Sequence, residues 1–266
     1  IRQLHEAKVQ VAGGIQKTGC LTEQDMIRIT NLVKRYQGRT VLSIEGLEIH
    51  DGEIFGLVGN NGAGKTTLLR LMLDLIKADN GLVTSDEYPV ARSEMWKDYT
   101  SSFLDESFLI NFLTPEEFFT FIAEEYSLGR EVTNRRLDKF SEFFNDEILG
   151  KNKKYIRDFS RGNRQKIGIA SALLTEPRVL ILDEPFNGLD PSSQIILKRI
   201  LAQFNSEHGT MMIISSHDLN HITEICTRIA IIEKGVIIRD LHNDGNAMTE
   251  LARYFSVRNE STLFRH

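Results

Sequence analysis

The sequence predicts an α/β fold, in which a mostly parallel sheet carries a phosphate-binding loop and is joined by an antiparallel β subdomain and an inserted helical subdomain. Three observations predict it. A glycine-rich loop lies between an apolar run and a helical pattern, a second apolar run ends in two acids, and a Phe-rich stretch with helical spacing follows the loop. The 266 residues, 41% of them hydrophobic, can bury a substantial core in one large domain or two small ones.

The glycine-rich loop fits the pattern G-x-x-x-x-G-K-[ST] and follows the strand-like run 54–58. Backbone N–H groups must approach a polyphosphate closely, which favours residues without Cβ, and the helix that follows adds partial positive charge. Lys65 is the expected partner of the β- and γ-phosphates, and the Thr66 hydroxyl an expected ligand of Mg²⁺. The sequence therefore predicts a P-loop core that binds a nucleotide through Gly59, Asn60, Asn61, Gly62, Ala63, Gly64, Lys65, Thr66 and Thr67.

The chain before the loop predicts strands. Residues 1–24 lack an apolar region of signal-peptide length, so we expect an extension of unknown role there, with the domain itself spanning residues 25–255. The segments 26–30 and 47–50 alternate as half-buried antiparallel strands do. Between them, Tyr36 lies in a polar turn. It is either a half-buried loop tyrosine or, as we prefer, a platform on which a flat base stacks.

The chain after the loop turns helical. A helix is expected from Lys65 to about Ile76, and Thr114-Pro115-Glu116-Glu117 combines a capping residue, a first-turn proline and a glutamate at the third position. Ten of the fifteen phenylalanines lie between Phe103 and Phe159. They predict a mostly helical subdomain over about residues 105–165. Its phenylalanines either form its own small core or leave an exposed share that docks a partner.

The second informative region is a helix start followed by a buried strand. Backbone amides near Ser160 and Gly162 could hold an anion at the start of a helix expected over 166–174, although Ser160 could equally be a plain helix cap. The apolar run 179–182 predicts a parallel strand that delivers Asp183 and Glu184 at its C-terminal edge. Asp183 would meet Mg²⁺ and Glu184 would polarise an attacking water, and a structural ion pair is the alternative for each.

The last third of the chain predicts a further strand at 210–215, with His217 just beyond it, where the imidazole could hydrogen-bond a terminal phosphate. His221, one helical turn later, is expected to be a surface or capping residue. Strands at 228–233 and 236–239, a helix at 247–255 and a tail at 256–266 complete the expected organisation.

Composition excludes several functions. The net charge of -5 gives no support to an extended nucleic-acid surface, so we expect no nucleic-acid partner. Cys20 and Cys226 are far apart in sequence, which suits a reducing compartment better than a disulfide scaffold. Since no apolar run reaches the roughly 18 residues of a spanning helix, action at a membrane would require a separate spanning partner.

Taken together, these residues resemble the nucleotide-binding subunit of an ATP-binding-cassette (ABC) transporter over about residues 26–255. The resemblance implies that Tyr36 stacks on adenine, that Glu184 is the catalytic base and that His217 is a switch histidine. It also implies that the signature stretch contacts ATP bound to the opposite subunit of a homodimer or a paired cassette. The resemblance is carried by the phosphate loop, Ser160, Gly162, Asn163, Asp183, Glu184, Gly188, Leu189, Asp190 and His217.

Two segments depart from the commonest pattern of the family, at three residues. The signature usually reads L-S-G-G-Q, and here Arg161 stands at its first glycine and Asn163 at its last residue. Glu106 takes the position of a glutamine that usually meets Mg²⁺ and the membrane partner, and a carboxylate there can still bind a metal through water. This combination looks more like bacterial exporters than importers.

The resemblance therefore implies a subunit that binds ATP and Mg²⁺, hydrolyses the ATP and drives export. Its expected partners are a separate transmembrane permease subunit and a second cassette, and its expected place is the cytoplasmic face of the cell membrane, as a peripheral protein. The alternative is a non-transport ABC ATPase that remodels a protein or nucleic-acid assembly.

Overall fold

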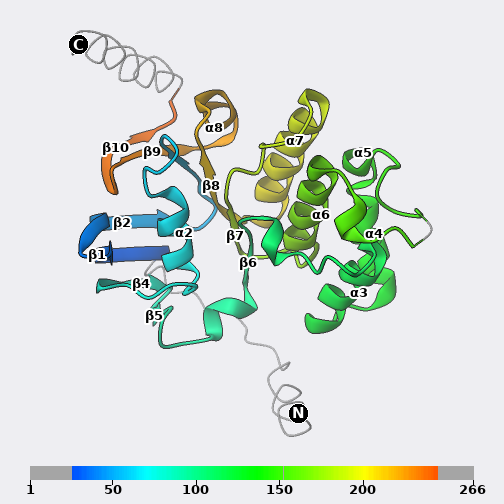
Figure 1. Ribbon diagram of the computed structural model, residues 1–266, viewed down its shortest axis with the longest axis horizontal. Helices are drawn as coiled ribbons and strands as arrows, with labels where there is room; N and C mark the ends of the chain where they lie inside the picture. Colours follow the sequence, from blue (N-terminus) through cyan, green and yellow to red (C-terminus); the bar gives the residue numbers. More distant parts are fainter. Residues whose placement is uncertain (1–25, 152, 245–266) are drawn as a thin grey trace, which may run out of the picture.

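The structure, a computed structural model, describes residues 26–151 and 153–244. Two sheets and a group of helices form the molecule (Figure 1). The strands of the first sheet are β3 (Ile54–Val58), β6 (Thr100–Phe103), β7 (Val179–Leu182), β8 (Met211–Ser216), β9 (Arg228–Glu233) and β10 (Val236–His242). Those of the second are β1 (Met26–Tyr36), β2 (Arg39–His50), β4 (Asn80–Ser85) and β5 (Tyr88–Pro89).

The first sheet has the order β10-β9-β3-β8-β7-β6, and the second β2-β1-β4-β5. In the first sheet, every pairing from β6 to β9 is parallel, and β10 alone is added antiparallel to β9. The second sheet is antiparallel throughout. The predicted combination of a mostly parallel sheet with an antiparallel β subdomain is therefore confirmed.

Buried strands of the parallel sheet divide their side chains between two cores because successive residues point to opposite faces. In β7, Leu180 and Leu182 belong to one core, and Val179 and Ile181 to the other. The first core contains the Phe-rich helices, and the second contains the side of β1 and β2 that faces the parallel sheet. The parallel sheet is thus covered on both faces, as its uninterrupted apolar runs require.

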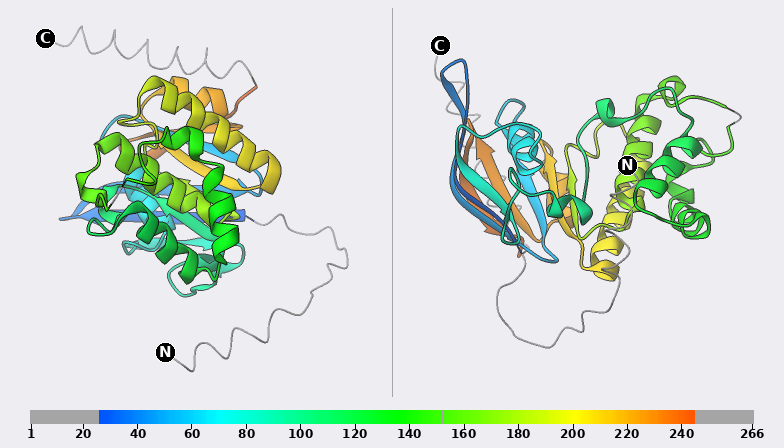
Figure 2. Two further views of the ribbon diagram at one scale, coloured as in Figure 1. Left: turned by 90° about the vertical axis from the view of Figure 1, so that its right-hand side faces the viewer. Right: turned by 90° about the horizontal axis from the view of Figure 1, so that it is seen from below.

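The helices lie mainly on one side of the molecule, away from the antiparallel sheet, as the right-hand view of Figure 2 shows. Among the helices of the described residues, α2 alone packs between the two sheets, through Leu68, Leu69 and Met72. The helices are α2 (Lys65–Met72), α3 (Pro115–Glu125), α4 (Arg130–Asp138), α5 (Ser141–Phe144), α6 (Arg161–Leu174), α7 (Pro191–His208) and α8 (Leu219–Ile225), with short turns of 3-10 helix at η1 (Met95–Asp98), η2 (Glu106–Phe108) and η3 (Ile156–Asp158).

Two predicted helix bounds were wrong. α2 ends at Met72 instead of Ile76, because Asp74 is left-handed at φ 51° and the Leu75 N–H donates to the Arg70 carbonyl at 2.9 Å, which closes the helix in a Schellman-type turn. α6 begins five residues earlier than 166, at Arg161, because Ser160 caps it. The extension at 1–24, the helix expected at 247–255 and the tail at 256–266 lie outside the described residues.

The phenylalanines serve mostly as the core of the helical region. Phe118 and Phe119 of α3 meet Phe140, Phe143 and Phe144, with the Phe119 and Phe144 rings stacked at a centroid distance of 5.9 Å. Aromatic rings bury large areas and so hold short helices together. Three of the ten lie exposed at the surface: Phe108, Phe112 and Phe121. The core explanation therefore holds for most of them and leaves a small exposed set.

The start of α3 forms the capping box that its sequence predicts. The Thr114 hydroxyl accepts from the Glu117 N–H at 3.2 Å, and the Glu117 carboxylate accepts from the Thr114 N–H at 2.8 Å. Thr114→Ala removes one of these bonds and should lower the free energy of unfolding by about 1 kcal/mol, measured by urea denaturation. Thr114→Ser keeps the hydroxyl and serves as the control. An equal loss in both variants would assign the effect to the threonine methyl group and not to the cap.

Candidate functional site

The loop before α2 adopts its shape because three positions lack a Cβ. Gly62 and Gly64 have φ of 80° and 111°, a region that other residues rarely adopt. A Cβ on Gly59 would lie only 2.4 Å from the Ile232 carbonyl oxygen of β9. No side chain caps α2 and no acid lies in its first turn. The first N–H groups of the helix therefore face the loop without a competing side chain, as an anion site requires.

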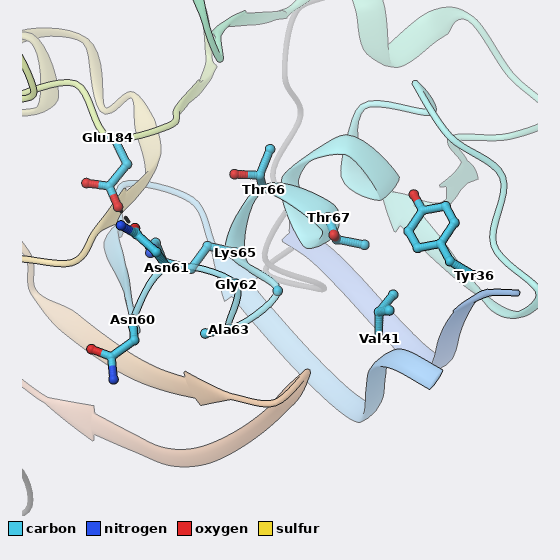
Figure 3. Close-up of a pocket in the computed structure, with 11 residues that line it drawn as sticks. Tyr36, Val41, Asn60, Asn61, Gly62, Ala63, Lys65, Thr66, Thr67 and Glu184 are labelled. Carbon is cyan, nitrogen blue, oxygen red and sulfur yellow. Dashed lines mark ion pairs between the residues drawn. The ribbon is translucent and has the colours of Figure 1, made fainter. Parts of the chain in front are cut away.

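The loop forms the floor of a cleft of about 320 Å³. Tyr36, at the end of β1, is 48% exposed and lies on the side of the cleft away from Glu184 (Figure 3). Its ring neighbours Val41 and Thr67 in that view. The sequence-predicted cleft residues are thus brought together: Tyr36, Asn60, Asn61, Gly62, Ala63, Gly64, Lys65, Thr66, Thr67 and Glu184 line it, with Val41 in addition.

Lys65 and Glu184 meet inside this cleft. The Lys65 ammonium donates to the Gly59 carbonyl at 2.6 Å and lies 3.1 Å from Glu184 Oε1, an ion pair marked in Figure 3. Glu184 Oε1 has no hydrogen-bond partner, so its contact with Lys65 is a charge contact without directed geometry. Because Lys65 is only 6% exposed, its charge needs a partner, and Glu184 supplies one.

The other oxygen of Glu184 is held by His217. His217 Nδ1 lies 2.8 Å from Glu184 Oε2, and the His217 backbone N–H donates to the same oxygen at 3.3 Å. Glu184 itself is left-handed at φ 48°, a conformation that costs a non-glycine residue roughly 1–2 kcal/mol. Its side chain is thereby aimed from the end of β7 across to β8. Glu184 and His217 are thus in direct contact, and their roles toward a nucleotide remain predictions.

Asp183 is fixed from two sides. The Thr66 hydroxyl donates to Asp183 Oδ2 at 2.5 Å, and the Ser215 hydroxyl donates to Asp183 Oδ1. Asp183 is 6% exposed. A carboxylate and a hydroxyl are oxygen donors of the kind that Mg²⁺ takes when phosphates complete its shell. The described residues contain no cluster of three or more His, Cys, Asp or Glu that would hold a metal alone.

Sequence reasoning missed Ser215, the residue that joins the two acids. Fully buried at the end of β8, it donates to Asp183 and its hydroxyl oxygen accepts from the Glu184 N–H at 2.9 Å. The signal was available, because neighbouring parallel strands end at the same edge. With Leu182 opposite Ile214, the residues after each fall side by side.

The signature residues Ser160, Gly162 and Asn163 lie at the start of α6, outside the cleft. The Ser160 hydroxyl accepts from the Asn163 N–H at 3.2 Å and so caps α6, and Asn163 Nδ2 donates to Glu147 at 2.9 Å. A Cβ on Gly162 would lie 2.8 Å from the Gly188 carbonyl oxygen, so α6 packs tightly against the 188–190 link. None of the three signature residues lines the cleft. Their contact with a nucleotide remains a prediction.

Glu106, expected near Mg²⁺, and Asp190, expected at an interface with a second subunit, both lie outside the cleft. Glu106 accepts from Arg164 Nε at 2.6 Å in place of facing Thr66 and Asp183, so its metal role remains a prediction. Asp190 caps α7, and hydrogen bonds from the Ser193 side chain and backbone lower the pKa of its carboxyl.

His221 and Cys226 are internal. His221 is half-buried instead of lying at the surface, its ring stands 4.6 Å from that of Phe186, and burial lowers the pKa of the imidazole. Burial likewise raises the pKa of the Cys226 thiol, which keeps it protonated and unreactive. Neither side chain contributes chemistry to the cleft.

A cleft formed by a glycine-rich loop, a buried lysine and the strand-end carboxylate of Glu184, with Asp183 bound to the hydroxyl of Thr66, defines a P-loop nucleotide-binding protein. The family model described as ABC transporter matches residues 43–187. The chain therefore belongs to the ABC transporter family, and its resemblance to an ATP-hydrolysing ABC cassette is confirmed.

Curated relatives of this chain are also named as ATP-binding proteins of transporters. An uncharacterized ABC transporter ATP-binding protein, YhcH of Bacillus subtilis, is 33% identical over 89% of this chain and 76% of its own length. The lantibiotic transport ATP-binding protein SrtF of Streptococcus pyogenes is 32% identical over 85% of this chain and 94% of its own length. The bacitracin transport ATP-binding protein BcrA of Enterococcus faecalis is 34% identical over 85% of this chain and 73% of its own length. Two relatives from Synechocystis and Nostoc are longer, and the chain spans 54% and 61% of them.

Solved structures share the fold. An ATP-binding subunit of an ABC transporter superposes with a TM-score of 0.75 at 27% identity, over 88% of this chain and 94% of that one. The ATP-binding cassette MJ0796, in a dimeric post-hydrolysis state bound to ADP and Pi, superposes with a TM-score of 0.73 over 82% of this chain and 99% of that one. Because the two sequences are only 23% identical, this likeness supports the fold alone.

Ser215 offers a test of the acid pair. Ser215→Ala should leave ATP binding intact and slow turnover roughly tenfold or more, because both carboxylates lose their alignment. Phosphate release and binding of a fluorescent ATP analogue measure the two quantities separately. Ser171→Ala is the control, since Ser171 donates to the Gly168 carbonyl at 2.7 Å within α6, outside the cleft. Unchanged phosphate release by Ser215→Ala would contradict the alignment role.

Proposed function

We propose that this chain powers export by hydrolysing ATP for separate transmembrane permease subunits. The observation that carries the proposal is the meeting of Lys65, Asp183 and Glu184 at one edge of the parallel sheet. Export is supported by two relatives whose names give lantibiotic and bacitracin transport. The non-transport alternative has no comparable support, since the names of these relatives specify transport.

Mg²⁺ fits the oxygen pair formed by Thr66 and Asp183. The two side chains lie 2.5 Å apart at the loop end of the cleft, which leaves the remaining ligand positions to phosphate oxygens and water. When bound, the ion would neutralise charge that develops on the phosphates. Thr66 and Asp183 would hold it, and Ser215 would keep Asp183 in place.

Glu184 is the proposed base. A terminal phosphate in the cleft would compete for Lys65, since an anion that accepts from both the ammonium and the helix N–H groups binds better than a carboxylate alone. Glu184 would then be released from Lys65 but kept in place by His217. Its free oxygen would orient and deprotonate the attacking water. Tyr36 would stack on the adenine ring, as its exposed ring in the cleft allows.

A second cassette completes the proposed site. Ser160, Gly162 and Asn163 do not line the cleft of their own chain. They begin a 14-residue helix and would be presented to ATP held by the partner, a second copy or a paired cassette, with Asp190 at the same interface. The dimeric cassette of the same fold supports this arrangement.

The helical subdomain, proposed for about residues 105–165, would transmit motion to the permease. Two of its exposed aromatics, Phe108 and Phe112, lie within six residues after Glu106. The segment carrying them is tied to η3, since Ile156 and Arg157 donate to the carbonyls of Leu113 and Asn111. Exposed aromatic rings on a braced loop are typical of a docking surface. No helix among the described residues combines the length and apolar character of a membrane span. Because the relatives are ATP-binding subunits named for transport, we propose that the chain acts at the cytoplasmic face of the cell membrane as a peripheral subunit.

Glu184→Gln tests the base. The amide keeps the shape but cannot take a proton, so ATP should still bind, the closed dimer should be stabilised, and turnover should fall on the order of a hundredfold or more. Phosphate release and size-exclusion chromatography with ATP measure these effects. Glu94→Gln is the control, since Glu94 lies outside the cleft in an exposed ion pair with Lys97. Near wild-type phosphate release from Glu184→Gln would refute its role as the base.

Lys65→Ala tests the phosphate contact. Removing the ammonium should abolish measurable nucleotide binding, because the phosphates lose their only buried cation among the residues that line the cleft. Binding of labelled ATP measures the effect, and Lys97→Ala, which changes an exposed lysine, is the control. Unchanged affinity in Lys65→Ala would show that the loop does not hold phosphate.

A further inference from the structure

Two adjacent acids, Asp105 and Glu106, lie between the phosphate-loop helix and the signature helix. Asp105 Oδ2 is 3.5 Å from Arg70 Nη2 of α2, and Glu106 Oε2 accepts from Arg164 Nε of α6 at 2.6 Å. A second arginine of α6, Arg161, places its Nε 3.7 Å from Glu106 Oε1. Neighbouring carboxylates thus hold two different helices.

Both acids are suited to a charged role. Burial by itself would raise the pKa of Asp105, but hydrogen bonds from Ser107 and the charge of Arg70 outweigh it and lower the pKa. The side chains of Glu106 and Arg164 are 31% and 24% exposed, so their pair is screened less than a fully exposed one.

Arg164 links Glu106 to the backbone just before α6. Arg164 Nη1 donates to the Phe159 carbonyl at 2.7 Å, while its Nε holds Glu106. Phe159 immediately precedes Ser160, the N-cap of α6. A single guanidinium therefore connects Glu106 with the turn that carries the signature residues, and its fork geometry fixes both contacts at once.

Two of the three residues that depart from the commonest family pattern face each other here. Glu106 stands where a glutamine is usual and Arg161 where a glycine is usual, and they form an ion pair at 3.7 Å. Arg161 also lies along the 188–190 link, with side-chain atoms 3.6 Å from the position of a Cβ on Gly188. The two departures are complementary in charge and location.

We infer that Glu106 is a positioning residue that holds the start of α6 through Arg164, and not a ligand of Mg²⁺. Together with the Asp105–Arg70 pair, it sets the orientation of Ser160 and Gly162 relative to α2 and the phosphate loop. The inference rests on the proposed function, in which these residues complete the site of a second cassette. Glu106 is not among the residues that line the cleft and pairs with Arg164 and Arg161 of α6, so we expect binding of ATP to its own chain not to depend on it.

A double-mutant cycle tests the inference on the purified full chain. Glu106→Gln, Arg164→Gln and the double variant are compared with the wild type for kcat, for the KM of ATP and for the Mg²⁺ concentration that gives half-maximal turnover. We expect Glu106→Gln to lower kcat roughly tenfold while KM and the Mg²⁺ requirement stay unchanged. Because the two residues act as a unit, the double variant should be no slower than Arg164→Gln alone.

Glu142→Gln is the matched control, since Glu142 of α5 forms an exposed ion pair with Arg199 at 2.7 Å. This substitution should leave kcat, the KM of ATP and the Mg²⁺ requirement unchanged. A large rise in the Mg²⁺ requirement of Glu106→Gln would make Glu106 a metal ligand and overturn the inference. Independent, multiplying losses in the double variant would also overturn it. A Glu106→Gln variant as fast as an active wild type would overturn it while leaving the proposed function intact.

Discussion

The parallel pairing of β3, β7 and β8 is the constraint on which the rest of the molecule depends. Their carboxyl ends meet at one edge, which brings the phosphate loop, Asp183 with Glu184, and Ser215 with His217 within hydrogen-bonding range. None of these side chains could meet through local sequence, since more than a hundred residues separate Thr66 from Asp183. The uninterrupted burial of the strands on both faces stabilises this alignment, so the core and the site share one cause.

Charge within the cleft is balanced around Glu184. One oxygen of the Glu184 carboxylate pairs with the ammonium of Lys65, and the other contacts the imidazole of His217. A buried lysine without a partner would be costly, so the proposed base also stabilises the lysine that is meant for phosphate. The left-handed backbone of Glu184 adds strain at the same point. A site organised in this way is poised for an anion that displaces one contact and keeps the other.

The second level of organisation connects the cleft with the helical region. Asp105 and Glu106 reach α2 and α6, while the Phe-rich core makes α3, α5 and α6 one packed group. The same two acids therefore link this group of helices to the phosphate-loop helix. Phe108 and Phe112 lie just beyond the two acids and are exposed at the surface.

Much could be predicted from the sequence because the signals were local. The loop pattern, the capping box at Thr114 and the apolar runs ending in acids each depend on a few neighbouring residues, and the structure bears out the elements they predicted. Helix ends were less accurate, as at Asp74, since the left-handed turn depends on backbone bonds that the pattern of apolar residues does not reveal.

What the sequence by itself determined was the class of fold and the chemical groups of the cleft, because strand, loop and helix are consecutive there. Only the tertiary structure decided which groups face one another. It paired Ser215 with Asp183 through strand register, and it turned Glu106 toward Arg164 and away from the cleft. These contacts join residues far apart in the chain, and their geometry arises only when the sheets and helices have packed.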